Sequence, residues 1–342
     1  MKKNRILAAV AAAIIGISGL PAAAGAQEVP ALPQIPGLPP VPPIALPAPG
    51  AGAPAPLPLP AILPPAPVAA PPEINGDVRE SYVSFGDSLA ANPTVTDIAV
   101  NKAQKAGLPV PWRNIRPGFC AQGPNNFPAQ TAQKTGLRLV DYSCGGATAY
   151  VQTQPTDPIP HDTLADQVDC AIANNHLNGD TRLVSVSIGV NDTYQMSNLN
   201  VPDTDGRQQR YRDAVIPALN RSKQAAPGAK VVLLGIPDQT DDHNQTCATN
   251  LYGVVSHWYF PIVSNYQEEV RNEQRDSANA AGVQFLDMAD EISAASGLNG
   301  CSPNPQRRSA AVFDDAPHRF TFHLTDAGHG YYSDRLAQVY HG

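Results

Sequence analysis

A serine follows a short apolar run in the tetrapeptide Gly86-Asp87-Ser88-Leu89. The residues before it, Ser81–Phe85, have the composition of a buried strand, and Gly86 permits the backbone turn that ends this strand. In open α/β folds, ligands bind at the carboxyl ends of such strands. A serine held there can act as a nucleophile when the chain also supplies a base and a site for an oxyanion. Ser88 is therefore the candidate nucleophile.

Two further clusters follow predicted strands and could supply the oxyanion site. One contains Gly145-Gly146, where the absence of side chains lets a backbone N–H face a cleft. The other is Gly189-Val190-Asn191-Asp192, in which the asparagine amide could donate to a developing negative charge. Taken alone, each cluster favours an ordinary turn, because Gly, Asn and Asp are common turn residues.

Two histidines near the C-terminus could act as the base. His323 lies just before a predicted helix with Thr325 as its N-cap, and a ring on such a short loop can reach across the sheet edge to a serine. His329 lies six residues later, inside the same predicted helix. A ring held within a helix is less free to reach Ser88.

Taken in order, these residues resemble the four sequence blocks of the SGNH/GDSL hydrolase family. The resemblance covers about residues 80–340 and includes the cysteine placement of secreted actinobacterial lipases and esterases. The matching segments are Phe85-Gly86-Asp87-Ser88, Cys144-Gly145-Gly146-Ala147-Thr148, Gly189-Val190-Asn191-Asp192 and the terminal segment that contains His323.

The resemblance implies a role for each residue. Ser88 would be the nucleophile and His323 the base, while the N–H groups of Ser88 and Gly146 and the side chain of Asn191 would form an oxyanion hole. It implies a serine esterase or lipase that cleaves carboxylic esters through an acyl-enzyme, with no cofactor and no metal. An acyltransferase or deacylase that uses the same site on cell-envelope glycans or lipids is the alternative.

Position 320 departs from the family pattern, which often has Asp three residues before the catalytic histidine. In one interpretation, the backbone carbonyl of Phe320 orients the Nδ1–H of His323. In the other, Asp326 and His329 form an Asp-x-x-His pair that replaces His323. Two carboxylates in the preceding loop could also supply the acid: Asp314 and Asp315.

The elements that must position these residues alternate between strand and helix. The predicted strands are short, apolar and bounded by turn residues: Ser81–Phe85, Arg138–Tyr142, Arg182–Ile188, Lys230–Gly235 and Val283–Met288. The predicted helices are amphipathic: Phe127–Thr135, Asp162–Asn174, Arg207–Gln224, Pro261–Ala281 and about Asp326 to Tyr340. This alternation predicts an α/β fold, a three-layer α/β/α sandwich with a five-stranded parallel sheet of the SGNH/flavodoxin-like kind. Two long connections, Asn92–Pro117 and Asp238–His257, are candidates for a substrate-binding rim.

The N-terminal composition predicts export. Residues 1–26 combine basic residues, an apolar run and a small-residue cleavage site, as in a secretory signal peptide. Residues 27–74 form a proline-rich linker, since 18 of the 36 prolines fall between Pro30 and Pro72. This linker could be a spacer or a tether to the cell envelope. The remaining residues, 75–342, form a single hydrolase domain. We expect a secreted, extracellular or envelope location and no transmembrane helix.

Five cysteines follow the linker, and an exported chain favours disulfides over metal ligands. We expect the pairs Cys120–Cys144 and Cys247–Cys301, which leaves Cys170 as a thiol on a helix. The acidic cluster before Cys247 matches no zinc spacing, so no metal is expected. The net charge of −7 argues against nucleic acid as a partner. The expected partner is a small-molecule or lipid ester.

Overall fold

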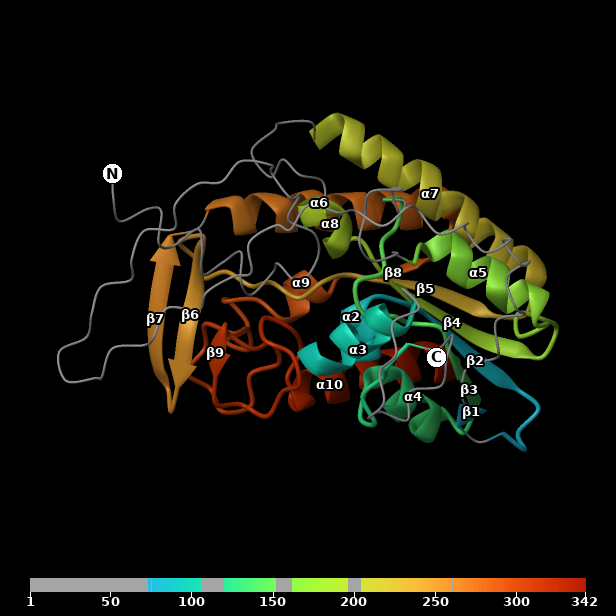
Figure 1. Ribbon diagram of the computed structural model, residues 1–342, viewed down its shortest axis with the longest axis horizontal. Coiled ribbons are helices and arrows are strands. Elements are labelled where there is room, and N and C mark those ends of the chain that lie inside the picture. The colour runs from blue at the N-terminus through green and yellow to red at the C-terminus, as the bar shows by residue number, and fades with distance from the viewer. Residues whose placement is uncertain (1–72, 75, 106–119, 152–161, 196–203, 260) are drawn as a thin grey trace, which may run out of the picture. The chain divides into compact units, whose positions relative to one another are not determined.

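The computed structural model describes residues 73–74, 76–105, 120–151, 162–195, 204–259 and 261–342. Their main element is a parallel sheet, as predicted (Figure 1). Its five parallel strands are, in spatial order, β3 (Arg138–Asp141), β2 (Ser81–Gly86), β4 (Thr181–Ser187), β5 (Lys230–Leu234) and β8 (Gln284–Leu286). A two-residue strand, β1 (Glu73–Ile74), adds to the β3 edge in antiparallel orientation.

The strand order contains one reversal of direction. The chain passes from β2 to its neighbour β3 and then returns to β4 on the other side of β2. Open α/β sheets bind ligands outside the carboxyl ends of the strands at such a switch point. The segments that follow β3, β2 and β4 therefore meet at the same edge of the sheet.

Both faces of the sheet are buried. Successive residues of a strand point to opposite faces, so each strand contributes side chains to two apolar clusters. Tyr82 and Leu183 pack into one apolar cluster, while their neighbours Val83 and Val184 pack into the other. Such burial on both sides explains why adjacent apolar residues, such as Leu183 and Val184, occur in these strands instead of a strict alternation of buried apolar and exposed polar residues.

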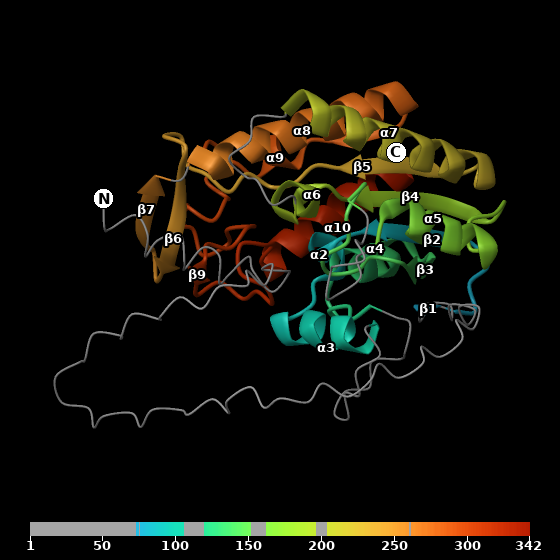
Figure 2. The ribbon, with the colours of Figure 1, turned by 45° about the horizontal axis from the view of Figure 1, so that its top comes forward.

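Helices supply the other half of each cluster. α5 (Leu164–Ala173) and α7 (Thr204–Ala225) cover one face, whereas α4 (Phe127–Thr135) and α10 (Asp326–His341) cover the other, and α8 (Pro261–Ala281) contributes to both clusters. Figures 1 and 2 show α7 lying along α5 and α8. The remaining helices are α2 (Ser88–Ala91), α3 (Val95–Lys105), α6 (Val190–Gln195) and α9 (Met288–Glu291). Helices therefore cover both faces of the sheet, and the predicted three-layer arrangement is confirmed.

A second, three-stranded sheet replaces most of the predicted long loop at Asp238–His257. It consists of β7 (Val254–Tyr259), β6 (Gln245–Leu251) and β9 (Phe313–Asp314), with β6 in the centre. Figure 2 shows this sheet beyond the end of the main one. The prediction of a loop was wrong because β6 (Gln-Thr-Cys-Ala-Thr-Asn-Leu) has no regular alternation of apolar and polar residues, and the turn Tyr252-Gly253 is not a typical hairpin pair.

Two disulfides fasten the segments around the sheets. Cys120–Cys144 connects the segment before α4 to the loop after β3, and Cys247–Cys301 connects β6 to the loop that leads to β9. Cys170, in α5, is half-buried and belongs to neither disulfide. Both pairs are those expected from the sequence.

The predicted signal peptide, residues 1–26, lies outside the described residues, as does the predicted linker up to residue 72. Glu73 and Ile74, which the sequence assigned to the linker, pair with β3 and so belong to the sheet. Among the described residues, no helix combines the length and the apolar composition that crossing a membrane requires.

Candidate active site

Ser88 is the first residue of α2, directly after the turn that ends β2. Asp87 caps this helix, because its side chain accepts a hydrogen bond of 2.9 Å from the N–H of Leu89. Burial raises the pKa of Asp87 to about 7. Ser88 is nearly buried. The capping contact gives Asp87 a role in shaping the turn.

Gly86 cannot be replaced without moving the neighbouring strand. A Cβ at this position would lie 2.4 Å from the carbonyl oxygen of Ser187 in β4. The side chain of Gln167 in α5 pairs with Gly86 in both directions: it accepts from the Gly86 N–H at 2.8 Å and donates to the Gly86 carbonyl at 2.9 Å. This double contact, which we did not predict, fixes the backbone two residues before Ser88.

His323 lies beside Ser88, the candidate nucleophile. Its Nε2 is 2.8 Å from the Oγ of Ser88, although the two residues are 235 positions apart in the chain. Its Nδ1 is 3.0 Å from the carbonyl oxygen of Thr321. A carbonyl can only accept, so the ring proton is on Nδ1 and the lone pair of Nε2 faces the serine. This tautomer is the one that a general base requires.

The carbonyl that contacts the ring of His323 was predicted incorrectly. It belongs to Thr321 and not to Phe320. Phe322 adopts a φ of 62°, in the left-handed region, and the resulting turn brings the carbonyl two residues before His323 onto its ring. Phe320 contributes its side chain instead, packed edge-on with its centroid 4.4 Å from that of the imidazole.

Burial lowers the pKa of His323 to about 4, since a charged imidazolium loses hydration there. The carbonyls of Thr321 and Phe322 oppose this effect, and His318 adds to it. The ring is therefore neutral at pH 7 and can accept a proton.

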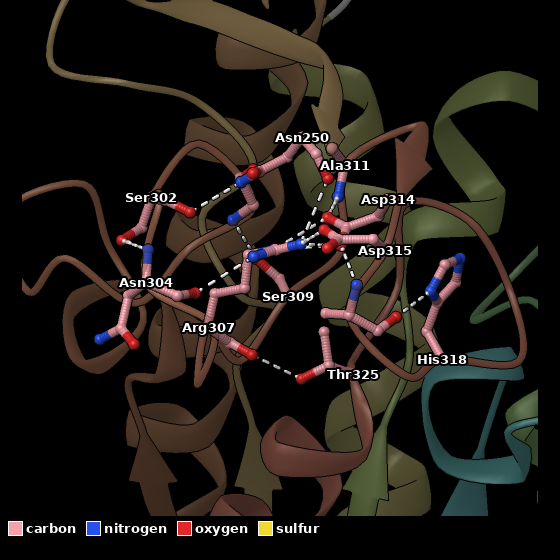
Figure 3. A network of polar contacts seen from close by, with 12 residues as sticks. Asn250, Ser302, Asn304, Arg307, Ser309, Ala311, Asp314, Asp315, His318 and Thr325 are labelled. Carbon is pink, nitrogen blue, oxygen red and sulfur yellow. Dashed lines mark hydrogen bonds and ion pairs between the residues drawn. The ribbon is translucent and has the colours of Figure 1, made fainter. Parts of the chain in front are cut away.

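Asp314 and Asp315, which the sequence offered as possible acids, contact an arginine instead (Figure 3). The guanidinium of Arg307, with its side chain only 2 % exposed, donates from Nε to Asp314 at 3.0 Å and from Nη2 to Asp315 at 2.5 Å. These carboxylates thus neutralise a buried cation, and the ring nitrogen of His323 that an acid would contact is bonded to Thr321.

The Arg307 network also fixes the loop before α10. Asp314 accepts a hydrogen bond of 2.7 Å from the N–H of Ala311, and the hydroxyl of Thr325 donates to the Arg307 carbonyl at 2.7 Å. Thr325 is the N-cap of α10, as predicted, and accepts from the N–H of Gly328. The loop that carries His323 is therefore held at both ends.

His329 and Asp326, the alternative base and acid, are placed elsewhere. His329 is 1 % exposed, and its Nδ1 accepts a hydrogen bond of 3.2 Å from the N–H of Phe127 at the start of α4. Burial lowers its pKa to about 3. Asp326 is exposed at the start of α10. The hydrogen bond to Ser88 comes from His323, not from this pair.

The two proposed oxyanion donors besides Ser88 follow the strands that flank β2. Gly146 lies after β3 and has a φ of 83°, which favours glycine, and Asn191 lies after β4 in α6. The Asn191 amide donates to the carbonyl of Ala147 at 2.6 Å. Because β3 and β4 are the neighbours of β2, both residues lie at the sheet edge that holds Ser88.

Asp192 holds the rest of this loop, a role that we did not predict. Its buried carboxylate accepts hydrogen bonds of 2.7, 2.9 and 3.0 Å from three successive N–H groups, those of Ala149, Tyr150 and Val151. Burial raises its pKa to about 6 despite these bonds. The Asn-Asp pair after β4 is the feature of the sequence from which this role could have been predicted. Both side chains form hydrogen bonds between α6 and the loop after β3.

Two groups of side chains within the described residues have donor atoms close enough to hold a metal: Cys247, His257 and Cys301, and Cys120, Cys144 and Asp162. In both, the two cysteines form a disulfide, so neither sulfur is a thiolate that could bind a cation.

Known proteins align with this chain in sequence and in structure. Lipase 2 from Streptomyces coelicolor is 26 % identical over 225 residues, which are 58 % of this chain and 71 % of that protein. The crystal structure of phospholipase A1 from Streptomyces albidoflavus aligns at 17 % identity with a TM-score of 0.47, covering 77 % of this chain and 99 % of that one. An extracellular lipase from Streptomyces rimosus aligns at 19 % identity with a TM-score of 0.46, covering 76 % and 99 %.

The family comparison extends over most of the described sheet and its loops. The sequence model of the GDSL-like Lipase/Acylhydrolase family matches residues 84–331, a span that contains Ser88, Gly146, Asn191 and His323. The chain belongs to the GDSL-like lipase/acylhydrolase family.

Proposed function

We propose that the protein is a secreted esterase or lipase that hydrolyses carboxylic esters through an acyl-enzyme formed on Ser88. The observation that carries this proposal is the 2.8 Å contact between the Oγ of Ser88 and the Nε2 of His323, with the proton of the ring held on Nδ1 by Thr321. This arrangement suits proton removal from the serine as its oxygen attacks a carbonyl.

In the first half of the reaction, the Oγ of Ser88 bonds to the acyl carbon and its proton passes to Nε2 of His323. The backbone N–H groups of Ser88 and Gly146 and the amide of Asn191 donate to the resulting oxyanion. The bond to the leaving alcohol then breaks, and His323 returns the proton to the alcohol oxygen.

In the second half, His323 removes a proton from a water molecule that attacks the acyl carbon. The tetrahedral intermediate collapses, the carboxylic acid leaves, and the proton passes from His323 back to the oxygen of Ser88. The enzyme returns to its starting state, and the sum of the two halves is ester plus water giving acid plus alcohol.

Export is the second part of the proposal. It is supported by the signal-like residues 1–26 and by two disulfides, which persist in oxidising compartments outside the cytosol. N-terminal sequencing of the protein released into a bacterial culture medium tests it, with Gln27 as the expected first residue.

Turnover of p-nitrophenyl esters of increasing chain length tests the chemistry. Ser88→Ala and His323→Ala should each lower kcat by at least about a thousandfold, because the nucleophile and its base act as a unit. His243→Ala, at an exposed histidine, is the matched control and should keep full activity. Full activity in Ser88→Ala, or loss in His329→Gln with His323→Ala unaffected, would contradict the assignment.

A further inference from the structure

The tip of the β6–β7 hairpin presents an aromatic ring to solvent. Tyr252 and Gly253 form a two-residue turn in which both residues have a positive φ, 52° and 78°. Asn, Asp and Gly are favoured in such turns, while a tyrosine in the left-handed region is energetically unfavourable. Tyr252 is nevertheless there and is 91 % exposed.

The strands next to the tip continue this apolar surface on one face. Leu251 pairs with Val254, and the alternation along β7 places Val254 and Trp258 on the same side. Phe313 of β9 pairs with Thr249 and so points to that side as well. We call Leu251, Tyr252, Val254, Trp258 and Phe313 the hairpin patch. Each of these side chains is at least partly exposed, with Val254 at 73 % and Phe313 at 52 %.

The hairpin patch carries no charge. Between Gln245 and Tyr259 the sequence contains no Asp, Glu, Lys or Arg. His257 is the one titratable group there apart from tyrosine and cysteine. It pairs with Cys247, so it belongs to the opposite face, where its Nδ1 lies 2.7 Å from Asp241.

The opposite face is fastened to the rest of the molecule. Cys247 is bonded to Cys301, and the amide of Asn250 donates to the carbonyls of Gly300 at 3.0 Å and Ser302 at 2.7 Å (Figure 3). The hairpin patch is thus held on a rigid support rather than on a loose loop.

Backbone contacts connect this support to the catalytic loop. Just before Phe313, the N–H of Val312 donates to the carbonyl of Cys247. In the same segment, the carbonyl of Ala311 accepts from the N–H of Phe322, and the N–H of Ala310 donates to the carbonyl of His323 at 2.8 Å. The strand beside the hairpin therefore continues directly into the segment paired with the base.

We propose that the hairpin patch binds the surface of a zwitterionic phospholipid layer. Tyr and Trp favour the headgroup region of a bilayer, and exposed aliphatic side chains insert at the acyl boundary. An anionic lipid surface would instead require Lys or Arg, which the patch lacks, and the net charge of −7 would be repelled by it. The inference rests on the proposed function, because it brings an ester hydrolase to an ester-containing surface.

Binding is measured with the Ser88→Ala protein that begins at Gln27, so that neither hydrolysis nor the apolar run of residues 1–26 affects the result. This protein is co-sedimented with phosphatidylcholine vesicles, with and without Tyr252→Asn and Val254→Thr together. Asn suits the left-handed turn position and Thr suits the strand, so the hairpin should persist. We expect the partition coefficient to fall by about tenfold or more in the doubly changed hairpin.

The matched control replaces two equally apolar, partly exposed side chains elsewhere, Val78→Thr and Ile172→Gln, and should bind vesicles like the parent. Thermal unfolding verifies that each variant is folded. Equal binding by the hairpin variant, or binding only to vesicles with anionic lipid, would overturn the proposal. Size-exclusion chromatography tests a second copy of the chain as the occupant: a dimer formed by the parent and lost in the hairpin variant would also overturn the proposal. Turnover of a soluble short-chain ester by the protein with Ser88 intact tests the proposed function separately.

Discussion

His323 receives its orientation from a backbone carbonyl rather than from a carboxylate. In a triad with Asp, the acid stabilises the imidazolium and raises its pKa. Here the carbonyl oxygen of Thr321 lies 3.0 Å from Nδ1 of His323 and fixes the tautomer of the ring. Burial lowers the pKa of the same ring to about 4. The consequence is an imidazole that stays unprotonated well below neutral pH.

The pH dependence of kcat/KM follows from this pKa. Only the neutral ring can accept the serine proton, so activity is lost as pH falls through the pKa of His323 in the free enzyme. We expect the acidic limb near pH 4, not near the ordinary histidine value of about 6.5. The measurement is an initial-rate profile on a neutral soluble ester, with circular dichroism at each pH to verify folding. A limb at or above pH 6.5 would show that a carboxylate assists the base.

Asn191 is expected to act on the transition state rather than on substrate binding. Asn191→Ala should lower kcat by about 100- to 1000-fold with little change in KM, which is the usual cost of removing one oxyanion donor. Asn279→Ala, at an exposed asparagine of α8, is the control. An unchanged kcat would remove Asn191 from the site.

At the scale of elements, helix α10 packs against α4 through a neutral histidine. The Nδ1 of His329 accepts from the N–H of Phe127, and the rings of the two residues stack with centroids 6.1 Å apart. The pKa of His329 falls to about 3 on folding. The unfolded chain therefore binds a proton near pH 6.5 that the folded protein does not bind, so this contribution to stability is present above pH 6.5 and is lost as pH falls toward 3.

His329→Gln removes this titration and keeps an oxygen that can accept from Phe127. Between pH 7 and pH 5, the free energy of unfolding should fall by about 2 kcal/mol less in the variant than in the parent. Buried carboxyls with raised pKa, such as Asp192, have the opposite pH dependence, but they are common to both proteins and cancel in the difference. Urea titrations at the two pH values give the difference. Identical pH dependence in both proteins would mean that His329 is protonated in the fold.

The disulfide at the hairpin should contribute to global stability. Cys247–Cys301 closes a loop of 54 residues, and the chain-entropy model then assigns it about 4 kcal/mol. Replacing both cysteines by Ala should lower the free energy of unfolding by about this amount, measured in urea. Cys170→Ala, which leaves both disulfides intact, should change it far less. A negligible loss in the double variant would show that the hairpin is held by its hydrogen bonds alone.

Over the whole molecule, local pattern predicted the parts of the fold that local physics determines. The five strands of the parallel sheet are apolar on both faces and bounded by turn residues, and the bounds of α4 and α8 were predicted correctly. The hairpin was missed because Tyr252 stands where a turn residue is expected, and β6 is held by the distant Cys301.

The hydrogen bonds that position the site residues were harder to predict from the sequence, because they depend on distant residues and on single backbone angles. Ser88 and His323 could be proposed as partners from their motifs, whereas the pairing of Gln167 with Gly86 crosses 81 residues and has no local signal. The choice of the Thr321 carbonyl depends on the φ of Phe322, a single backbone angle that residue type does not determine.

Covalent labelling tests whether Ser88 is a nucleophile that His323 activates. A fluorophosphonate ester forms a stable phosphonyl ester with such a serine, and peptide mapping by mass spectrometry locates it. We expect one label, on Ser88, with the labelling rate lowered at least about a hundredfold in His323→Ala and little changed in His329→Gln. A label on another residue, or an unchanged rate in His323→Ala, would contradict it.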